Sequence, residues 1–153
     1  SRGLGDVYKR QEKGYRAWGS DIGPDHTPVE AGLGWAVKMR RNIPFRGREA
    51  IERQLAGGVK KMLACFVPDN PDVVLLGRET IYRDGKRVGW LSSGGFGYTS
   101  GKPIGYGYVR NPDGVSEDFV LSGKYELDVA RERVPCTVAL KPLYDPDMLR
   151  VRG

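Results

Sequence analysis

The chain has 153 residues, of which 22 are glycine and 10 are proline, and its formal net charge is +6. This length suits one or two small domains, and the glycine and proline content predicts many turns and short strands in place of a helical bundle. A net charge of +6 without a clustered basic face does not indicate a protein that binds nucleic acid.

The rare residue types exclude several further classes. Cys65 and Cys136 are far apart and each lies in an apolar run, so we expect buried thiols and a reducing compartment, not a disulfide scaffold. His26 is the single histidine and no Cys-x-x-Cys motif occurs, which argues against a metal site. No apolar run approaches the roughly 20 residues of a membrane-spanning helix, and no serine lies in a nucleophile elbow. We therefore predict no membrane partner and assign no catalytic residue within the chain.

Residues 1–11, SRGLGDVYKRQ, have neither an apolar period nor the apolar core of a signal peptide. The letters DVYKRQ look like the translated end of a sequencing adapter, so we predict a non-native leader; an ordinary disordered basic leader is the alternative. Under the first interpretation the chain is a fragment of a longer protein. We then expect Glu12 to lie at a frayed edge.

Residues 12–58 combine a turn, a strand and a helix. Thr27-Pro28-Val29-Glu30 predicts a short helical turn with proline at its first position. Residues 47–58 predict a helix, because Ile51 and Leu55 share one face and Gly57-Gly58 stops it. A half-buried strand is predicted where apolar residues alternate, at Leu33, Trp35, Val37 and Met39.

Residues 59–153 contain short strands separated by turn signals. Asp84-Gly85 is the dipeptide that a tight hairpin prefers, and Asn111-Pro112-Asp113-Gly114 is expected to close a strand. Such antiparallel strands at regular spacing predict a barrel or a sandwich. The predicted strands cover residues 62–67, 80–82, 87–90, 104–109, 125–129 and 134–140.

The glycine-rich stretch from Ser93 to Pro103 superficially suggests a phosphate-binding loop. The spacing to Gly101-Lys102 does not fit a Walker A motif, and Pro103 falls where its helix should begin. We interpret the glycines as sites of turns and close contacts between strands.

Four segments carry a resemblance to a known family. They are EKGYRAWGSDIGPDHTPVEAGLGWAVKMRR (12–41), GREAIERQLAGG (47–58), SSGGFGYTSGKPIGYGYV (92–109) and KPLYDPDMLRVRG (141–153). The sequence resembles the aminomethyltransferase family, which includes the glycine-cleavage T-protein, and is most similar to the C-terminal portion of sarcosine and dimethylglycine dehydrogenases. The resemblance implies an α+β fragment, residues 12–58 from the end of a folate-binding domain, followed by an antiparallel β-barrel, residues 59–153.

The resemblance also implies a tetrahydrofolate site. Glu12-Lys13-Gly14 matches the family segment in which a glutamate grips the pterin, and a carboxylate can accept two parallel hydrogen bonds from such a ring. Arg41 matches a second folate contact, although Arg40 is an alternative. The predicted cofactor-binding residues are thus Glu12, Lys13, Gly14 and Arg41.

Other positions are assigned roles beside these cofactor-binding residues. Glu30 matches a family signature, and we expect it to cap a turn instead of binding a ligand. The place of a family tyrosine near the folate is taken by Met148, with Tyr144 nearby. Possible walls of the site are Tyr15, Arg16 and Trp18.

The implied reaction is transfer of a one-carbon unit to tetrahydrofolate from an imine derived from a methylated amine. FAD would belong to an N-terminal domain outside this chain, so the fragment alone is not expected to be active. The remainder of its own polypeptide is the expected partner, in the cytoplasm of a bacterium or the mitochondrial matrix of a eukaryote. Two alternatives are a fragment of a glycine-cleavage T-protein and a non-catalytic relative similar to the regulatory subunit of pyruvate dehydrogenase phosphatase.

Overall fold

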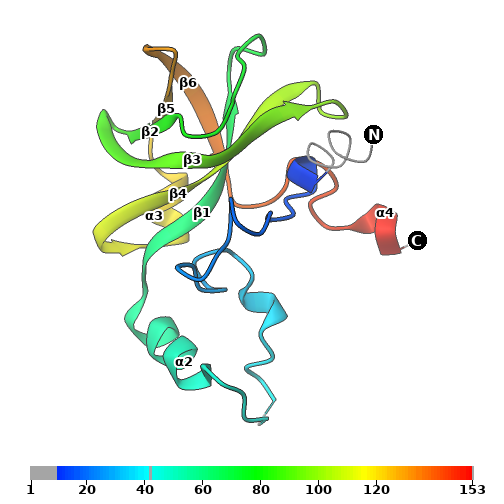
Figure 1. Cartoon of the computed structure of the whole chain (residues 1–153), viewed down its shortest axis with the longest axis vertical. Coiled ribbons are helices and arrows are strands. Elements are labelled where there is room, and N and C mark those ends of the chain that lie inside the picture. The colour runs from blue at the N-terminus through cyan, green and yellow to red at the C-terminus, as the bar shows by residue number, and fades with distance from the viewer. Residues whose placement is uncertain (1–9, 42, 153) are drawn as a thin grey trace.

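The computed structural model describes residues 10–41 and 43–152, and within them the strands form a closed antiparallel barrel (Figure 1). The order around the barrel is β1-β4-β3-β2-β5-β6, with β6 pairing back onto β1. This confirms the predicted barrel. The strands are β1 (Val59–Pro68), β2 (Thr80–Arg83), β3 (Lys86–Gly97), β4 (Lys102–Val115), β5 (Tyr125–Val129) and β6 (Glu132–Ala139).

The helices are short, and the one at Glu117–Leu121 contributes Val120 to the apolar interior of the barrel. They are the 3-10 helix η1 (Gly34–Ala36) and the α-helices α2 (Arg48–Gly57), α3 (Glu117–Leu121) and α4 (Leu149–Arg152). Figure 1 shows η1 and α2 together beyond one end of the barrel, while α4 lies on the side where the N-terminal segment runs.

The barrel interior is one apolar cluster to which every strand of the barrel contributes. Phe66, Ile81 and Leu127 are completely buried in it. Its members on the strands include Ala64 and Phe66 of β1, Ile81 of β2, Leu91 of β3, Val109 of β4, Leu127 of β5 and Cys136 of β6.

A second apolar cluster lies on the opposite face of β1 and β4. Successive side chains of a strand point to opposite faces, so the neighbours of the interior residues point outward. These outward residues are buried as deeply as the interior ones, and every residue of β1 from Leu63 to Pro68 is buried. The cluster consists of Leu63, Cys65 and Val67 of β1 with Ile104, Tyr106 and Tyr108 of β4.

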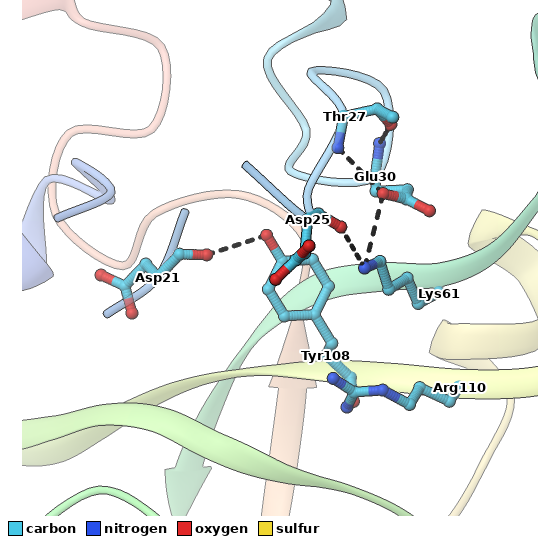
Figure 2. A network of polar contacts seen from close by, with 7 residues as sticks. All are labelled: Asp21, Asp25, Thr27, Glu30, Lys61, Tyr108 and Arg110. Atoms are coloured by element: carbon cyan, nitrogen blue, oxygen red, sulfur yellow. Dashed lines mark hydrogen bonds and ion pairs between the residues drawn. The ribbon is translucent and has the colours of Figure 1, made fainter. Parts of the chain in front are cut away.

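Polar contacts hold residues 17–31 against this outer face (Figure 2). The Tyr108 hydroxyl donates to the Asp21 carbonyl at 2.8 Å, and Ser92 Oγ donates to Asp21 Oδ1 at 2.7 Å. Lys61 Nζ donates to the Asp25 carbonyl at 2.6 Å. The His26 ring stacks on Tyr108 with 4.5 Å between centroids. The N-terminal segment therefore serves as the cover of the second cluster.

The hairpin and helix predictions are confirmed. β2 and β3 meet at Asp84-Gly85, and both residues have the positive φ, 51° and 77°, that a tight primed turn requires. The helix predicted over residues 47–58 is α2, and Gly58 with φ 78° follows its last residue. Of the glycines between Ser93 and Pro103, Gly94, Gly95 and Gly97 lie in β3 and Gly101 lies in the turn to β4, as expected.

The strand predicted at residues 33–39 is wrong. The backbone there bonds only locally, from Ala36 N to Leu33 O and from Val37 N to Gly34 O, and forms η1. No described strand runs beside it, and an alternating pattern without a partner strand has no ladder to join. Trp35 is 79% exposed as a result.

The prediction that Asn111-Pro112-Asp113-Gly114 closes a strand is also wrong. β4 continues to Val115, and the pairing with β1 jumps from Lys61–Arg110 to Val59–Val115. The four residues bulge out of the ladder, with Asn111 Nδ2 donating to the Gly114 carbonyl at 2.9 Å and Gly114 at φ 115°. Turn-forming residues can thus bend a strand without ending it.

Both thiols are expected to be unreactive in the folded protein. Cys65 and Cys136 are free and buried, and burial raises the pKa of each to about 12. At pH 8 roughly one thiol in 10⁴ is then ionised. We predict that iodoacetamide modifies neither residue in buffer and both in guanidinium chloride, as measured by intact mass. Native modification at the rate of free cysteine would contradict the buried placement.

Because of His26, the free energy of unfolding should decrease as the pH falls below 6.5. Burial, and then the positive charge of Lys61, holds the pKa of His26 below its ordinary 6.5; Arg110 acts in the same direction, and Glu30 and Asp25 oppose it. The unfolded chain therefore binds the proton more readily, and stability is lost as the pH falls through the unfolded pKa.

We predict that the urea midpoint drops between pH 7.5 and pH 5.5, and that His26→Gln reduces this drop. Urea titrations of both proteins at the two pH values measure it. The same pH dependence in the variant would show that His26 is not the group responsible.

Candidate functional site

A cavity of about 760 Å³ lies between the N-terminal segment and the C-terminal segment that follows β6. One wall comes from residues 13–16, 22, 32, 33 and 35, and the other from residues 140–142 and 146–148. Aromatic, charged and apolar side chains line it, among them Lys13, Tyr15, Arg16, Trp35, Lys141 and Met148.

Lys13 joins the two walls. Its Nζ lies 2.6 Å from Asp145 Oδ2, and it also faces the Tyr144 ring at 5.4 Å. The hydrogen bond from Lys13 is the main cause that lowers the pKa of Asp145, so the Asp145 carboxylate stays ionised at neutral pH. Asp145 Oδ1 also accepts from Leu149 N at 2.8 Å, which ties the start of α4 to the same carboxylate.

Gly14 lets the two walls approach each other closely. Its φ is +67°, and a Cβ there would lie 2.8 Å from Pro142 Cγ. Arg16 holds this stretch in place, because its guanidinium donates to the carbonyls of Gly14 and Ala31. Lys13 and Gly14 therefore lie together in the wall of the cavity, as two neighbouring members of the predicted site.

Glu12 does not line this cavity. The expectation that it lies at a frayed edge is wrong: its side chain is 2% exposed. Glu12 Oε1 accepts from the backbone N–H groups of Thr99 and Ser100, each at 2.8 Å, in the turn between β3 and β4. The carboxylate thus fixes the N-terminal segment to the barrel beside Gly14. Residues 1–9 of the predicted leader lie outside the described residues, and Gln11 is buried.

Arg41 lies in a second cavity, of about 570 Å³, together with Lys38 and Arg40. Its floor is apolar and includes Ile51 and Leu55 of α2. The loop that carries these basic residues is held to α2 by Arg48, which donates to three backbone carbonyls. These belong to Met39, Arg41 and Ile43. The structure thus separates Arg41 from Lys13 and Gly14, although Trp35 lines both cavities.

The structure confirms the role predicted for Glu30 and places the expected wall residues differently from one another. Glu30 caps the turn as predicted: its Oε2 accepts from Thr27 N at 2.9 Å, and Glu30 N donates to Thr27 Oγ1 at 3.3 Å (Figure 2). Met148, like Tyr15 and Arg16, lines the first cavity. Trp18 lies outside both cavities and is 75% exposed.

Sequence reasoning missed Asp145, Pro142 and Trp35 as site residues. The Asp145-Pro146 pair is a turn signal, yet nothing local shows that its carboxylate meets Lys13, 132 residues earlier. Trp35 was missed because its alternating neighbours predicted a strand.

The arrangement suits binding more than acid–base chemistry. The first cavity offers aromatic faces and cations with fixed backbone around them, a setting for a flat ligand that carries polar groups. Within the described residues, no group of three or more His, Cys, Asp or Glu side chains could hold a metal ion. None of the described helices is long and apolar enough to cross a membrane.

The fold is a six-stranded antiparallel barrel. A preceding segment covers its outer face and forms one wall of a cavity. Residues 61–145 match the glycine cleavage T-protein C-terminal barrel domain, so the chain belongs to this family. A crystal structure of the glycine cleavage system aminomethyltransferase T from Bartonella henselae is similar, with a TM-score of 0.77 and 26% identity over 91% of this chain and 38% of that one.

Curated relatives extend the similarity beyond the barrel. Mouse mitochondrial sarcosine dehydrogenase is 44% identical over 93% of this chain, and rat mitochondrial dimethylglycine dehydrogenase is 32% identical over 94%. The regulatory subunit of pyruvate dehydrogenase phosphatase from mouse is 36% identical over 88%. The chain spans 16% of the length of each of these relatives. It is therefore homologous to a portion of much longer proteins, including enzymes.

The contact between Gly14 and Pro142 gives a test of the cavity wall. Alanine at either Gly14 or Gly19 must adopt a positive φ, at a cost of about 1–2 kcal/mol. Gly19 has open space around it, whereas Gly14 faces Pro142, so Gly14→Ala adds overpacking of about 1–3 kcal/mol.

We predict that Gly14→Ala lowers the free energy of unfolding by at least 1 kcal/mol more than Gly19→Ala. Urea denaturation measures both. Equal losses would mean that the two walls do not meet at Gly14.

Proposed function

We propose that this chain is the tetrahydrofolate-binding portion of an FAD-dependent sarcosine or dimethylglycine dehydrogenase, in which a one-carbon unit is passed to the folate. The observation that carries the proposal is that Lys13 and Gly14, which the family resemblance assigns to folate, lie in the wall of a cavity with aromatic and cationic lining. The 44% identity to mouse sarcosine dehydrogenase supports this class of enzyme above the glycine-cleavage T-protein.

The cavity fits a reduced folate in its chemistry. Tyr15 and Trp35 provide flat faces for a pterin ring, and Arg16 and Lys141 provide donors at the rim. The folate supplies an amine nitrogen that takes up the one-carbon unit. The residues of this chain contribute by holding that amine in a fixed position, so that an incoming carbon meets it at high effective concentration.

Glu12 is proposed as a pterin contact as well, although its buried side chain supports the wall beside Gly14 and does not line the cavity. Oε1 already binds the backbone of Thr99 and Ser100, so a pterin would be bound through Oε2. Arg41 is proposed to bind the carboxylate end of the same ligand. The roles of Glu12 and Arg41 can then be separated by substitutions that keep the fold.

The oxidation step is assigned to another part of the polypeptide. No described residue of this chain is proposed to bind FAD, and we expect the chain alone to show no dehydrogenase activity. The proposed partners are the folate, an imine derived from a methylated amine and the rest of the polypeptide. Since sarcosine dehydrogenase of mouse and of human is named as mitochondrial, we propose the mitochondrial matrix for a eukaryotic source and the cytoplasm for a bacterial one.

A non-catalytic regulatory role is the second candidate. It is favoured by the 36% identity to the regulatory subunit of pyruvate dehydrogenase phosphatase. The two candidates differ in what they require of the cavity, because a folate-dependent enzyme must bind reduced folate and a purely regulatory protein need not.

We predict that the chain binds 5-formyltetrahydrofolate and that Glu12→Gln weakens this binding about tenfold while the thermal midpoint stays within a few degrees. Glutamine keeps Oε1 as an acceptor for Thr99 and Ser100, but it removes the charge and the second acceptor oxygen. Nuclear magnetic resonance titration detects affinities into the millimolar range, and calorimetry serves for tighter binding.

Arg46→Ala is the matched control, because Arg46 is an exposed charged residue outside both cavities. If the unsubstituted chain binds no reduced folate, the proposed function is wrong and the regulatory candidate gains. If Glu12→Gln binds as tightly as Arg46→Ala, Glu12 is a structural residue only.

A further inference from the structure

The sequence contains two Asp-Gly dipeptides, Asp84-Gly85 and Asp113-Gly114. In such a pair the backbone nitrogen of the glycine can attack the side chain of the aspartate, because glycine has no side chain to obstruct the approach. Both aspartates are exposed, and both glycines have a positive φ, 77° for Gly85 and 115° for Gly114. Exposure and glycine conformation therefore do not distinguish the two positions, but their hydrogen bonds do.

Three contacts hold Asp84 in place. Its Oδ2 lies 2.6 Å from Arg83 Nη1, and its Oδ1 accepts from the Lys124 backbone N–H at 3.0 Å. Its own backbone N–H donates to the Lys124 carbonyl at 2.8 Å. Arg83 is fixed in turn, because its Nε donates to the Phe119 carbonyl at 3.1 Å. The Asp84 carboxylate cannot turn toward the nitrogen of Gly85 without losing hydrogen bonds to both of its oxygens.

The surroundings of Asp113 are different. Its backbone N–H reaches Asn111 Oδ1 at 3.4 Å, which is a long and weak contact. In the part of the chain that the structure describes, no donor or cation holds the Asp113 carboxylate. Residues 111–114 bulge out of the ladder between β1 and β4, so a longer backbone there does not have to break a strand pair.

We propose that Asp113 is a site of spontaneous isoaspartate formation in the folded protein and that Asp84 is protected from this reaction. The Gly114 nitrogen bonds to Asp113 Cγ, and the carboxyl OH leaves as water with the proton of that nitrogen. The resulting succinimide ring then takes up water at one of its two carbonyls. When the bond from the nitrogen to the main-chain carbonyl of Asp113 breaks, the α-carboxylate is freed and the chain continues through the side chain.

The product carries a group that a second enzyme can recognise. The freed α-carboxylate of an isoaspartate is the group that a protein-isoaspartate methyltransferase esterifies, with S-adenosylmethionine as the methyl donor. Pro112 and Asp113 are both exposed, so the modified bulge is accessible to such an enzyme. Asp113 lines neither the first nor the second cavity, and ligand binding is therefore expected to be unchanged by the modification.

The test stores the chain for several weeks in neutral buffer, with a parallel sample in guanidinium chloride. Methyl transfer from labelled S-adenosylmethionine measures total isoaspartate, and peptide mapping with Asp-N protease, which does not cleave at isoaspartate, locates it. In the folded sample isoaspartate should rise several-fold at residue 113 and stay at its initial level at residue 84. In guanidinium chloride both positions should react, because unfolding removes the contacts of Asp84.

Asp113→Glu is the matched variant, because it keeps the charge but would have to form a larger ring that closes slowly. It should remove most of the methyl acceptance of the folded chain and leave the reaction at residue 84 in guanidinium chloride unchanged. Absence of isoaspartate at residue 113 in the folded sample would overturn the proposal. Equal amounts at residues 113 and 84 in that sample would overturn it as well, since the contacts of Asp84 would then give no protection.

Discussion

Burial of the outer face of β1 and β4 is the constraint on which the rest of the structure depends. A closed barrel needs only its interior filled, yet here Ile104 and Tyr108 on the outside are as inaccessible as Leu91 within. The cover is a segment with little regular structure of its own, so its position comes from the barrel. Asp21 shows how: it accepts from Tyr108 through its carbonyl and from Ser92 through its carboxylate.

The first cavity is a consequence of this packing. Once residues 17–31 lie on the outer face, residues 12–16 pass along the end of the barrel, where Glu12 binds the turn between β3 and β4. Gly14 then meets Pro142 and Lys13 meets Asp145, so the segment after β6 becomes the opposite wall. The barrel therefore acts as the fixed body against which two irregular segments are held at a set distance. Such an arrangement is common, because binding and catalytic residues often lie on loops that a rigid scaffold holds in position.

Features encoded by neighbouring residues could be read from the sequence. Asp84-Gly85 predicted its hairpin, Thr27 and Glu30 are three residues apart and cap their own turn, and α2 has its stop signal at its own end. Errors arose where the outcome depends on a distant partner. The bulge at residues 111–114 exists because β1 continues to pair beyond it, which no local pattern reveals. The carboxylate of Glu12 accepts hydrogen bonds from backbone N–H groups that lie 87 and 88 residues further along the chain.

The most direct test of this account compares truncations on the two faces of the barrel wall. Ile104 and Leu91 are both fully buried, the first on the outer face of β4 and the second in the interior on β3. If the N-terminal segment makes the outer face a true core, Ile104→Ala and Leu91→Ala should each lower the free energy of unfolding by about 2–5 kcal/mol in urea titrations. A loss below about 1 kcal/mol for Ile104→Ala, as expected for a surface position, would contradict the account.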